Sequence, residues 1–137
     1  MKAEEKTIND ILSNKKYIIP SYQRPYSWNS DNALQLIDDI YTSFKEGTKE
    51  YFIGSLICIA KVSDTYEVVD GQQRLTTIGI ILAALKNQIS KPDIENDLQQ
   101  KIILKDIYGQ DNAQEEPRLK VRSNEYDLYT KYILQGD

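Results

Sequence analysis

An unbroken apolar repeat, which directly follows a β-rich segment, is the strongest constraint on the fold. The repeat consists of aliphatic side chains at intervals of three and four residues: Leu75, Ile78, Leu82, Leu85 and Ile89. This spacing predicts a helix that buries these side chains on one face and ends before Pro92. The preceding segments Tyr51–Lys61 and Tyr66–Val69 are rich in β-formers and predict a hairpin. Gly54 interrupts the first strand, so we expect a bulge or a close backbone approach there.

Shorter patterns predict the other elements. In chain order, they are a helix capped by Thr7, a strand over Tyr17–Pro20, a helix after Ser30, a helix over Asp93–Lys105, a strand over Leu119–Arg122 and a helix after Ser123. The helix after Ser30 should bury one apolar face, formed by Ala33, Ile37, Ile40 and Phe44. Helices and strands interleave around one apolar set, which predicts a single α+β domain over residues 1–137 with a small mixed sheet.

Composition narrows the function. Apolar residues make up 40% of the chain and charged residues 28%, which is typical of a soluble globular domain. One cysteine, Cys58, and no histidine exclude an internal disulfide, a structural zinc site and His-dependent catalysis, but leave Mg²⁺ possible. The net charge of −4 counts against a free-standing DNA-binding protein. The sequence contains neither a secretory signal nor a membrane-spanning run, so we expect a cytoplasmic protein without membrane contact.

The segment Asp70–Arg74 is the first candidate site, because it joins a predicted strand to the strongest predicted helix. The first turn of a helix favours anions, and Gly71 would let the backbone approach a phosphate. Arg74 offers a planar fork for phosphate oxygens, whereas Asp70 could hold Mg²⁺, orient a water molecule or accept a ribose hydroxyl. In the alternative interpretation, Asp70 is only a helix cap and Gly71 only a turn residue.

Two further segments are candidates for ligand contacts. The aromatic loop Tyr22–Trp28 carries Arg24 among its rings, an arrangement that can recognise a phosphate beside a stacked base. Alternatively, Arg24 stacks on Trp28 and the loop folds under its own aromatic rings. A basic stripe alternates along the last predicted strand and could meet a DNA backbone or simply form a solvated face: Arg118, Lys120 and Arg122.

Taken together, these segments resemble the N-terminal domain family of GmrSD-type restriction factors. The resemblance rests on the Ile-Pro-x-Tyr-Gln-Arg-Pro-Tyr-x-Trp pattern of residues 19–28, the Tyr-Phe-Ile-Gly-Ser run of residues 51–55, and the pentapeptide Asp70–Arg74. It implies a ParB- and sulfiredoxin-like fold and a nucleotide-binding, NTP-hydrolysing regulatory module in a modification-dependent DNA restriction or phage-defence system.

The resemblance also implies roles for residues. Asp70 and Arg74 would be catalytic, and the nucleoside triphosphate, with Mg²⁺, would contact Gln23, Arg24, Gly71, Gln72, Gln73 and Thr76. DNA would be engaged through or with a further nuclease domain, so we interpret the chain as a fragment that does not cleave DNA alone. Two alternatives remain: a ParB-like DNA-binding module without nucleotide turnover, and a non-catalytic scaffold that binds a partner protein.

Overall fold

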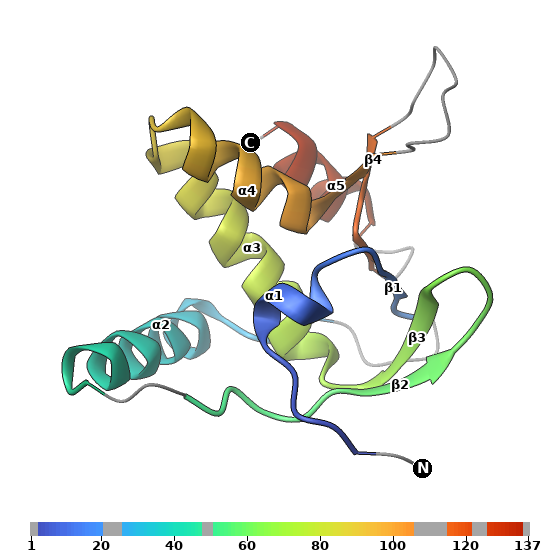
Figure 1. Cartoon of the computed structure of the whole chain (residues 1–137), viewed down its shortest axis with the longest axis horizontal. Coiled ribbons are helices and arrows are strands. Elements are labelled where there is room, and N and C mark those ends of the chain that lie inside the picture. The colour runs from blue at the N-terminus through green and yellow to red at the C-terminus, as the bar shows by residue number, and fades with distance from the viewer. Residues whose placement is uncertain (1–2, 21–25, 48–50, 106–114, 122–125, 136–137) are drawn as a thin grey trace.

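The computed structural model describes residues 3–20, 26–47, 51–105, 115–121 and 126–135 (Figure 1). The helices and strands of these residues are, in chain order, α1 (Ile8–Ile11), β1 (Lys16–Ile18), α2 (Ser30–Lys45), β2 (Ile57–Ala60), β3 (Thr65–Asp70), α3 (Gln72–Gln88), α4 (Pro92–Ile102), β4 (Ile103–Lys105), β5 (Glu115–Pro117), β6 (Leu119–Lys120) and α5 (Tyr126–Gln135). The predicted α+β class is therefore confirmed. The likeness to ParB and sulfiredoxin stays a prediction.

Four strands form one mixed sheet in the order β2-β3-β1-β6. The predicted hairpin is confirmed, because β2 and β3 pair antiparallel and Ser63 and Asp64 make the turn with φ angles of 54° and 57°. β1 lies between β3 and β6 and runs parallel to both, so segments from the two ends of the chain meet in this sheet. β4 and β5 form a separate antiparallel pair.

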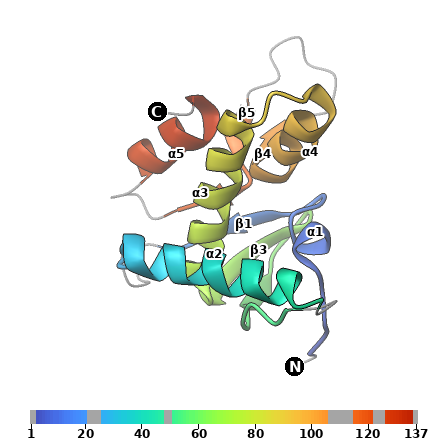
Figure 2. The ribbon, with the colours of Figure 1, turned by 90° about the vertical axis from the view of Figure 1, so that its left-hand side faces the viewer.

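The central element is α3, which leaves the sheet at the end of β3 (Figures 1 and 2). α4 and α5 pack against α3, and β6 also contacts it. The apolar core lies among these elements and the sheet, and its side chains Val68 of β3 and Ile133 of α5 have no exposed surface. The core thereby fixes α3 relative to the sheet.

The buried face of α3 differs from the predicted one. Its buried residues are Gln72, Leu75, Thr76, Thr77, Gly79 and Ala83. Leu75 is buried as predicted, but Leu85 is 45% exposed, so the predicted face is wrong at that position. The reason is close packing against α5, where the Tyr129 hydroxyl lies against Gly79. Small side chains permit this approach, and a periodicity of large aliphatic residues does not reveal it.

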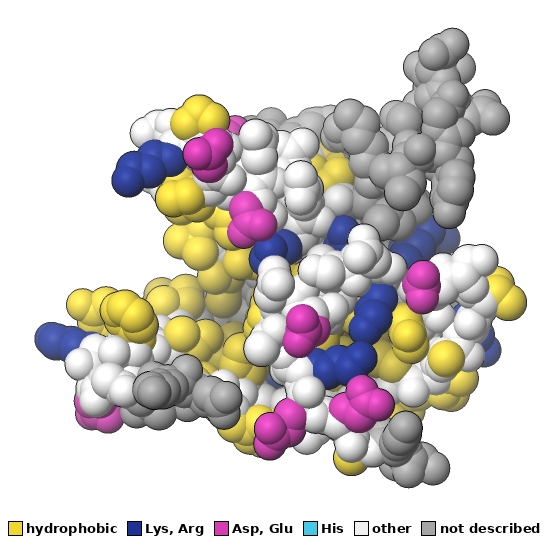
Figure 3. Space-filling model, in the orientation of Figure 1, with side chains coloured by type: hydrophobic (Ala, Val, Ile, Leu, Met, Phe, Trp, Pro, Cys, Tyr) yellow, Lys and Arg dark blue, Asp and Glu magenta, His cyan; other side chains and the backbone are white. Residues whose placement is uncertain are grey.

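The predicted burial of the apolar side chains of α2 is also wrong. The helix forms as expected, with Asn29 rather than Ser30 as its N-cap, but Leu36 is its only buried residue. Its exposed large apolar side chains are Leu34, Ile37, Ile40, Tyr41 and Phe44. Figure 3 shows apolar side chains on α2 facing a hollow between this helix and α4. α2 thus extends from the domain instead of covering its core.

Two predicted boundaries were wrong for local reasons. The strand expected over Tyr51–Lys61 is limited to β2, because the backbone around Gly54 and Ser55 packs against the β3–α3 turn instead of pairing. The helix expected to reach Lys105 ends at Ile102, where the chain enters β4 and pairs with β5.

We expect Gly79→Ala to lower the free energy of unfolding by about 1–3 kcal/mol, because the added methyl group would overlap the Tyr129 hydroxyl. In a Tyr129→Phe background the next atom lies 3.5 Å from the new Cβ, which is ordinary contact. There the same substitution should be neutral or stabilise by up to about 1 kcal/mol, since alanine favours helix. Urea unfolding of the four proteins measures this coupling. Equal effects of Gly79→Ala in both backgrounds would contradict the packing described.

Candidate functional site

The segment Asp70–Arg74 lies at the turn between β3 and α3, as predicted. Gly71 is the N-cap of α3 and has a left-handed conformation with φ of +94°. A Cβ atom on Gly71 would lie 2.7 Å from the backbone oxygen of Ser55. Both the backbone angle and this close approach require glycine, so the geometry of the turn depends on Gly71.

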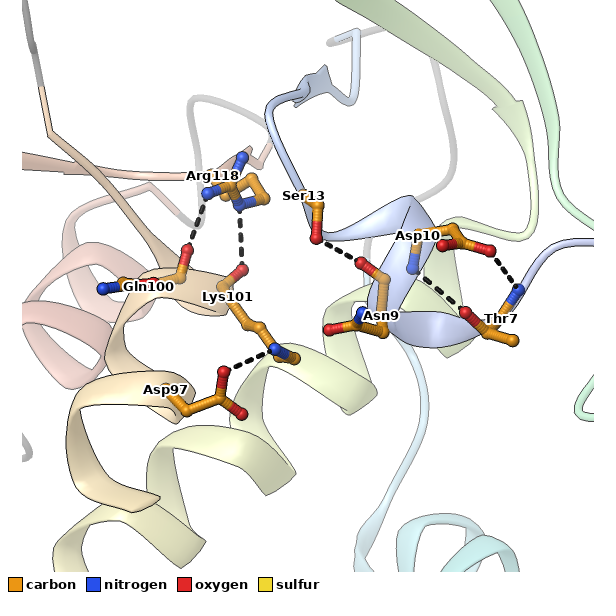
Figure 4. A network of polar contacts seen from close by, with 8 residues as sticks. All are labelled: Thr7, Asn9, Asp10, Ser13, Asp97, Gln100, Lys101 and Arg118. Carbon is orange, nitrogen blue, oxygen red and sulfur yellow. Dashed lines mark hydrogen bonds and ion pairs between the residues drawn. The ribbon is translucent and has the colours of Figure 1, made fainter. Parts of the chain in front are cut away.

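The N-terminus of α3 differs from those of α1 and α2. Thr7 and Asn29 cap those two helices through reciprocal hydrogen bonds, shown for Thr7 and Asp10 in Figure 4. Gly71 supplies no side-chain acceptor, and the first turn of α3 contains no acidic residue. Because Gly71 is the N-cap, the alternative in which Asp70 caps the helix is wrong. Asp70 is instead exposed at the end of β3, beside a helix terminus whose dipole favours an anion.

Arg74 is exposed in the first turn of α3 and lies between two surfaces. Its Cζ atom is 5.9 Å from the centroid of the Trp28 ring, a cation–π contact. On another side, a Cβ atom on Gly54 would lie 2.8 Å from Nε of Arg74. The close backbone approach predicted at Gly54 is therefore confirmed, and it is made to the candidate arginine.

The charge of Arg74 also acts on the segment after α2. Tyr51 donates a hydrogen bond from its hydroxyl to Oδ2 of Asp39 at 3.4 Å. Loss of hydration and the Asp39 carboxylate raise the pKa of Tyr51, whereas the Arg74 guanidinium partly opposes that rise. The Tyr51–Gly54 segment therefore borders the candidate site, through the contact of Gly54 with Arg74 and the charge of Arg74 on Tyr51.

Hydrogen bonds join the aromatic loop to the signature segment. The Oε1 atom of Gln73 accepts from the backbone N–H of Ser27 at 2.8 Å and from that of Trp28 at 3.3 Å. The hydroxyls of Tyr26 and Thr77 lie 2.8 Å apart. The two candidate segments therefore meet in space, at least for the part of the loop that the structure describes.

The remaining predicted nucleotide contacts differ in their placement. The side chains of Gln72 and Thr76 are buried, and the Thr76 hydroxyl donates to the backbone oxygen of Gln72 at 2.8 Å. Neither side chain is thus available to a ligand at the surface. Gln23 and Arg24 lie outside the described residues, so their predicted contacts stay predictions.

A hollow of about 490 Å³ lies elsewhere, beside α1 and the β2–β3 turn. Its lining consists of Glu5, Lys6, Asp10, Ser13, Asn14, Lys15 and Asp64. This lining is polar and carries charges of both signs, whereas ligand pockets are mostly apolar with few polar groups. We therefore place the candidate site at the β3–α3 turn, where the arginine and the anion-favouring helix terminus coincide.

The predicted basic stripe is not a shared surface. Arg118 lies between β5 and β6 and is buried, whereas Lys120 is exposed and Arg122 lies outside the described residues. The Arg118 guanidinium donates to three backbone oxygens, those of Lys15, Gln100 and Lys101, at 2.6–3.0 Å; Figure 4 shows the latter two. The residue breaks the strand and turns inward, so Arg118 does not lie on the exposed strand face where it was expected, and the DNA contact of the stripe stays a prediction.

Three further features concern metal ions, the cysteine and membranes. Within the described residues, His, Cys, Asp and Glu side chains form no group of three suited to a metal ion. Cys58 is half-buried in β2, and burial raises the pKa of its thiol to about 11, so it stays protonated. No helix among the described residues is long and apolar enough to cross a bilayer.

The chain belongs to the family of the GmrSD restriction endonuclease N-terminal domain, whose family model matches residues 8–136. This membership confirms the predicted resemblance and assigns the chain to the class of restriction and phage-defence components. A comparison with curated proteins finds no match.

Sequence reasoning missed several residues that build the site. Tyr26, Ser27 and Thr77 supply the contacts between the loop and α3, and Arg74 lies against Trp28. Two signals could have indicated this contact: the loop is rich in aromatic residues, and the loop and the signature both belong to the same family pattern. The pairing itself spans about fifty residues of sequence and depends on the fold.

We expect Arg118→Ala to lower the free energy of unfolding by at least about 3 kcal/mol, because it leaves three backbone oxygens without their charged donor. Lys120→Ala is the matched control on β6, and an exposed lysine should change stability by less than about 1 kcal/mol. Guanidinium unfolding measures both. An Arg118→Ala protein with unchanged stability and weakened DNA binding would restore the surface role.

Proposed function

We propose that this chain is the nucleotide-binding, NTP-hydrolysing regulatory domain of a modification-dependent restriction system. The observation that supports this proposal is the exposed Arg74 guanidinium, set in the first turn of a helix without a side-chain cap. A phosphate at this place would meet the positive end of the α3 dipole and a planar donor fork. Gly71 contributes through its left-handed backbone and its close approach to Ser55, which set the position of this helix terminus.

The exposed carboxylate of Asp70 completes the proposed chemistry. Carboxylate oxygens suit Mg²⁺, and Asp70 would hold the ion that accompanies the nucleotide or orient a water molecule. In hydrolysis the water oxygen bonds to the terminal phosphorus and the phosphoanhydride bond breaks, giving a nucleoside diphosphate and phosphate. Arg74 would stabilise the charge on the transferred group. Gln23, Arg24 and the backbone of Gly71–Gln73 are the further proposed contacts.

DNA is a proposed partner through, or together with, a further nuclease domain in the cytoplasm. The net charge of −4 gives this chain by itself little attraction for the DNA backbone, and Arg118 is committed to backbone oxygens of the protein. The alternative of a ParB-like DNA-binding module without turnover therefore has less support. A non-catalytic scaffold remains the other alternative, favoured by the exposed apolar side chains of α2.

A thermal-shift screen followed by calorimetry distinguishes these functions. The ligands are ATP, GTP, CTP and UTP, each with and without Mg²⁺. We expect Arg74→Ala to weaken binding of the nucleotide identified in this screen by at least about tenfold, because a charge-assisted hydrogen bond contributes about 1.5–3 kcal/mol. Lys86→Ala, at the other end of the same helix, is the matched control for loss of a positive charge and should leave the affinity unchanged.

Circular dichroism should show the same fold in all three proteins, since Arg74 is exposed. Equal affinity in wild type and Arg74→Ala would remove the nucleotide from this turn. An equal loss in Lys86→Ala would indicate general charge attraction instead of a site. Binding of none of the four nucleotides would favour the scaffold.

A further inference from the structure

One carboxamide oxygen holds two consecutive backbone N–H groups next to the candidate site. Oε1 of Gln73 accepts from Ser27 N at 2.8 Å and from Trp28 N at 3.3 Å. These two residues directly precede Asn29, the N-cap of α2. The side chain of Gln73 therefore ties the start of α2 to the first turn of α3.

A second polar contact supports the same connection one turn further along α3. The Thr77 hydroxyl donates its hydrogen to the backbone oxygen of Gln73 at 2.8 Å. Because threonine has one hydroxyl hydrogen, Tyr26 must be the donor in the 2.8 Å contact between the two hydroxyls. Residues 26–28 are thus attached to α3 at two successive turns.

The attached segment forms one wall of the arginine site. Trp28, whose backbone Gln73 holds, presents its ring to the Arg74 guanidinium at 5.9 Å. Gly54 forms another wall, so the direction of the Arg74 side chain is set by both. Displacing residues 26–28 would remove the Trp28 wall and leave Arg74 free to adopt other rotamers.

We propose that Gln73 is a positioning residue, which places Trp28 and through it Arg74, and that its Oε1 atom does not contact the nucleotide. This inference rests on the proposed nucleotide site and assigns Gln73 a role that differs from direct ligand contact. The Oε1 atom carries no hydrogen for a phosphate and would repel phosphate oxygens, so the inference concerns this atom and its hold on residues 26–28 and not the two N–H groups of Nε2. The two neighbouring signature residues then have different tasks: Arg74 binds and Gln73 places it.

Trp28 is the only tryptophan of the chain, so its fluorescence reports on the attached segment without labelling. In the nucleotide-free protein, Gln73→Leu should shift Trp28 emission to longer wavelength and increase its quenching by acrylamide. Gln73→Glu keeps an oxygen acceptor and should retain the wild-type emission. Gln88→Leu, an exposed glutamine at the end of α3, is the matched control and should change nothing.

Nucleotide affinity supplies the second measurement. Gln73→Leu should weaken binding about as much as Arg74→Ala does, at least about tenfold, since Arg74 loses its placement. Unchanged emission of nucleotide-free Gln73→Leu would overturn the inference, even if its affinity falls, because that pattern indicates direct contact. If no nucleotide binds wild type, the proposed function fails, but the emission of the three variants still decides the role of Gln73.

Hydrogen exchange in the wild-type protein keeps the inference testable if Gln73→Leu does not fold. The amides of Ser27 and Trp28 should exchange more slowly than the rates expected for an open chain, because both are hydrogen-bonded to Oε1 of Gln73. Exchange of both amides at the open-chain rate would overturn the proposal.

Discussion

The arrangement of the two sheets depends on the contacts of Arg118. Its guanidinium donates to the oxygens of Gln100–Lys101 in the last turn of α4 and to that of Lys15, just before β1. A helix C-terminus attracts a cation, and its last carbonyl groups lack partners within the helix. The backbone of Arg118 acts in the same place, since its N–H donates to Ile102 and its oxygen accepts from Tyr17. Arg118 thereby joins α4, the β4–β5 pair and the four-stranded sheet. Burial of its guanidinium costs hydration and lowers its pKa, and the hydrogen bonds to the backbone oxygens offset this cost.

The rigidity of the candidate site follows from the way α3 is held. Gly79 lets Tyr129 of α5 approach closely, and Ala83, further along, is completely buried. Leu75, one residue beyond Arg74, is buried in the same core. The first turn of α3 therefore presents the exposed Arg74 on a firmly packed element, and residues on such an element keep their relative positions. The Trp28 side of the site is held differently, by a few hydrogen bonds at the start of α2, a helix with little other packing.

The sequence allowed prediction of features that depend on neighbouring residues. The helix after the signature, the β2–β3 turn and the close approach at Gly54 were read from local patterns, and each is confirmed, although the buried face of α3 is not the predicted one. The local pattern also placed the signature at the strand-to-helix turn, because β-formers before Gly71 give way to the helical repeat after it. The wrong predictions concern long-range packing. Alternation placed Arg118 on a strand face, but its burial depends on carbonyl groups supplied by distant segments. The contact of Gln73 with Ser27 likewise joins residues that are 46 positions apart.

The position of Arg74 destabilises the start of α3, and this cost supports a binding role for the residue. A cation in the first turn of a helix is repelled by the dipole, and α3 has neither a side-chain cap nor an acidic residue there to compensate. α1 and α2 have side-chain caps, and α4, which has none, carries Asp93 and Glu95 in its first turn. Cation–π contact with Trp28 offsets part of the cost but does not neutralise the charge. An anion at this turn would interact favourably with both the helix dipole and the guanidinium. Local stability rules are most often broken where a site must interact with something else, so the uncapped start of α3 is where a phosphate would contribute most.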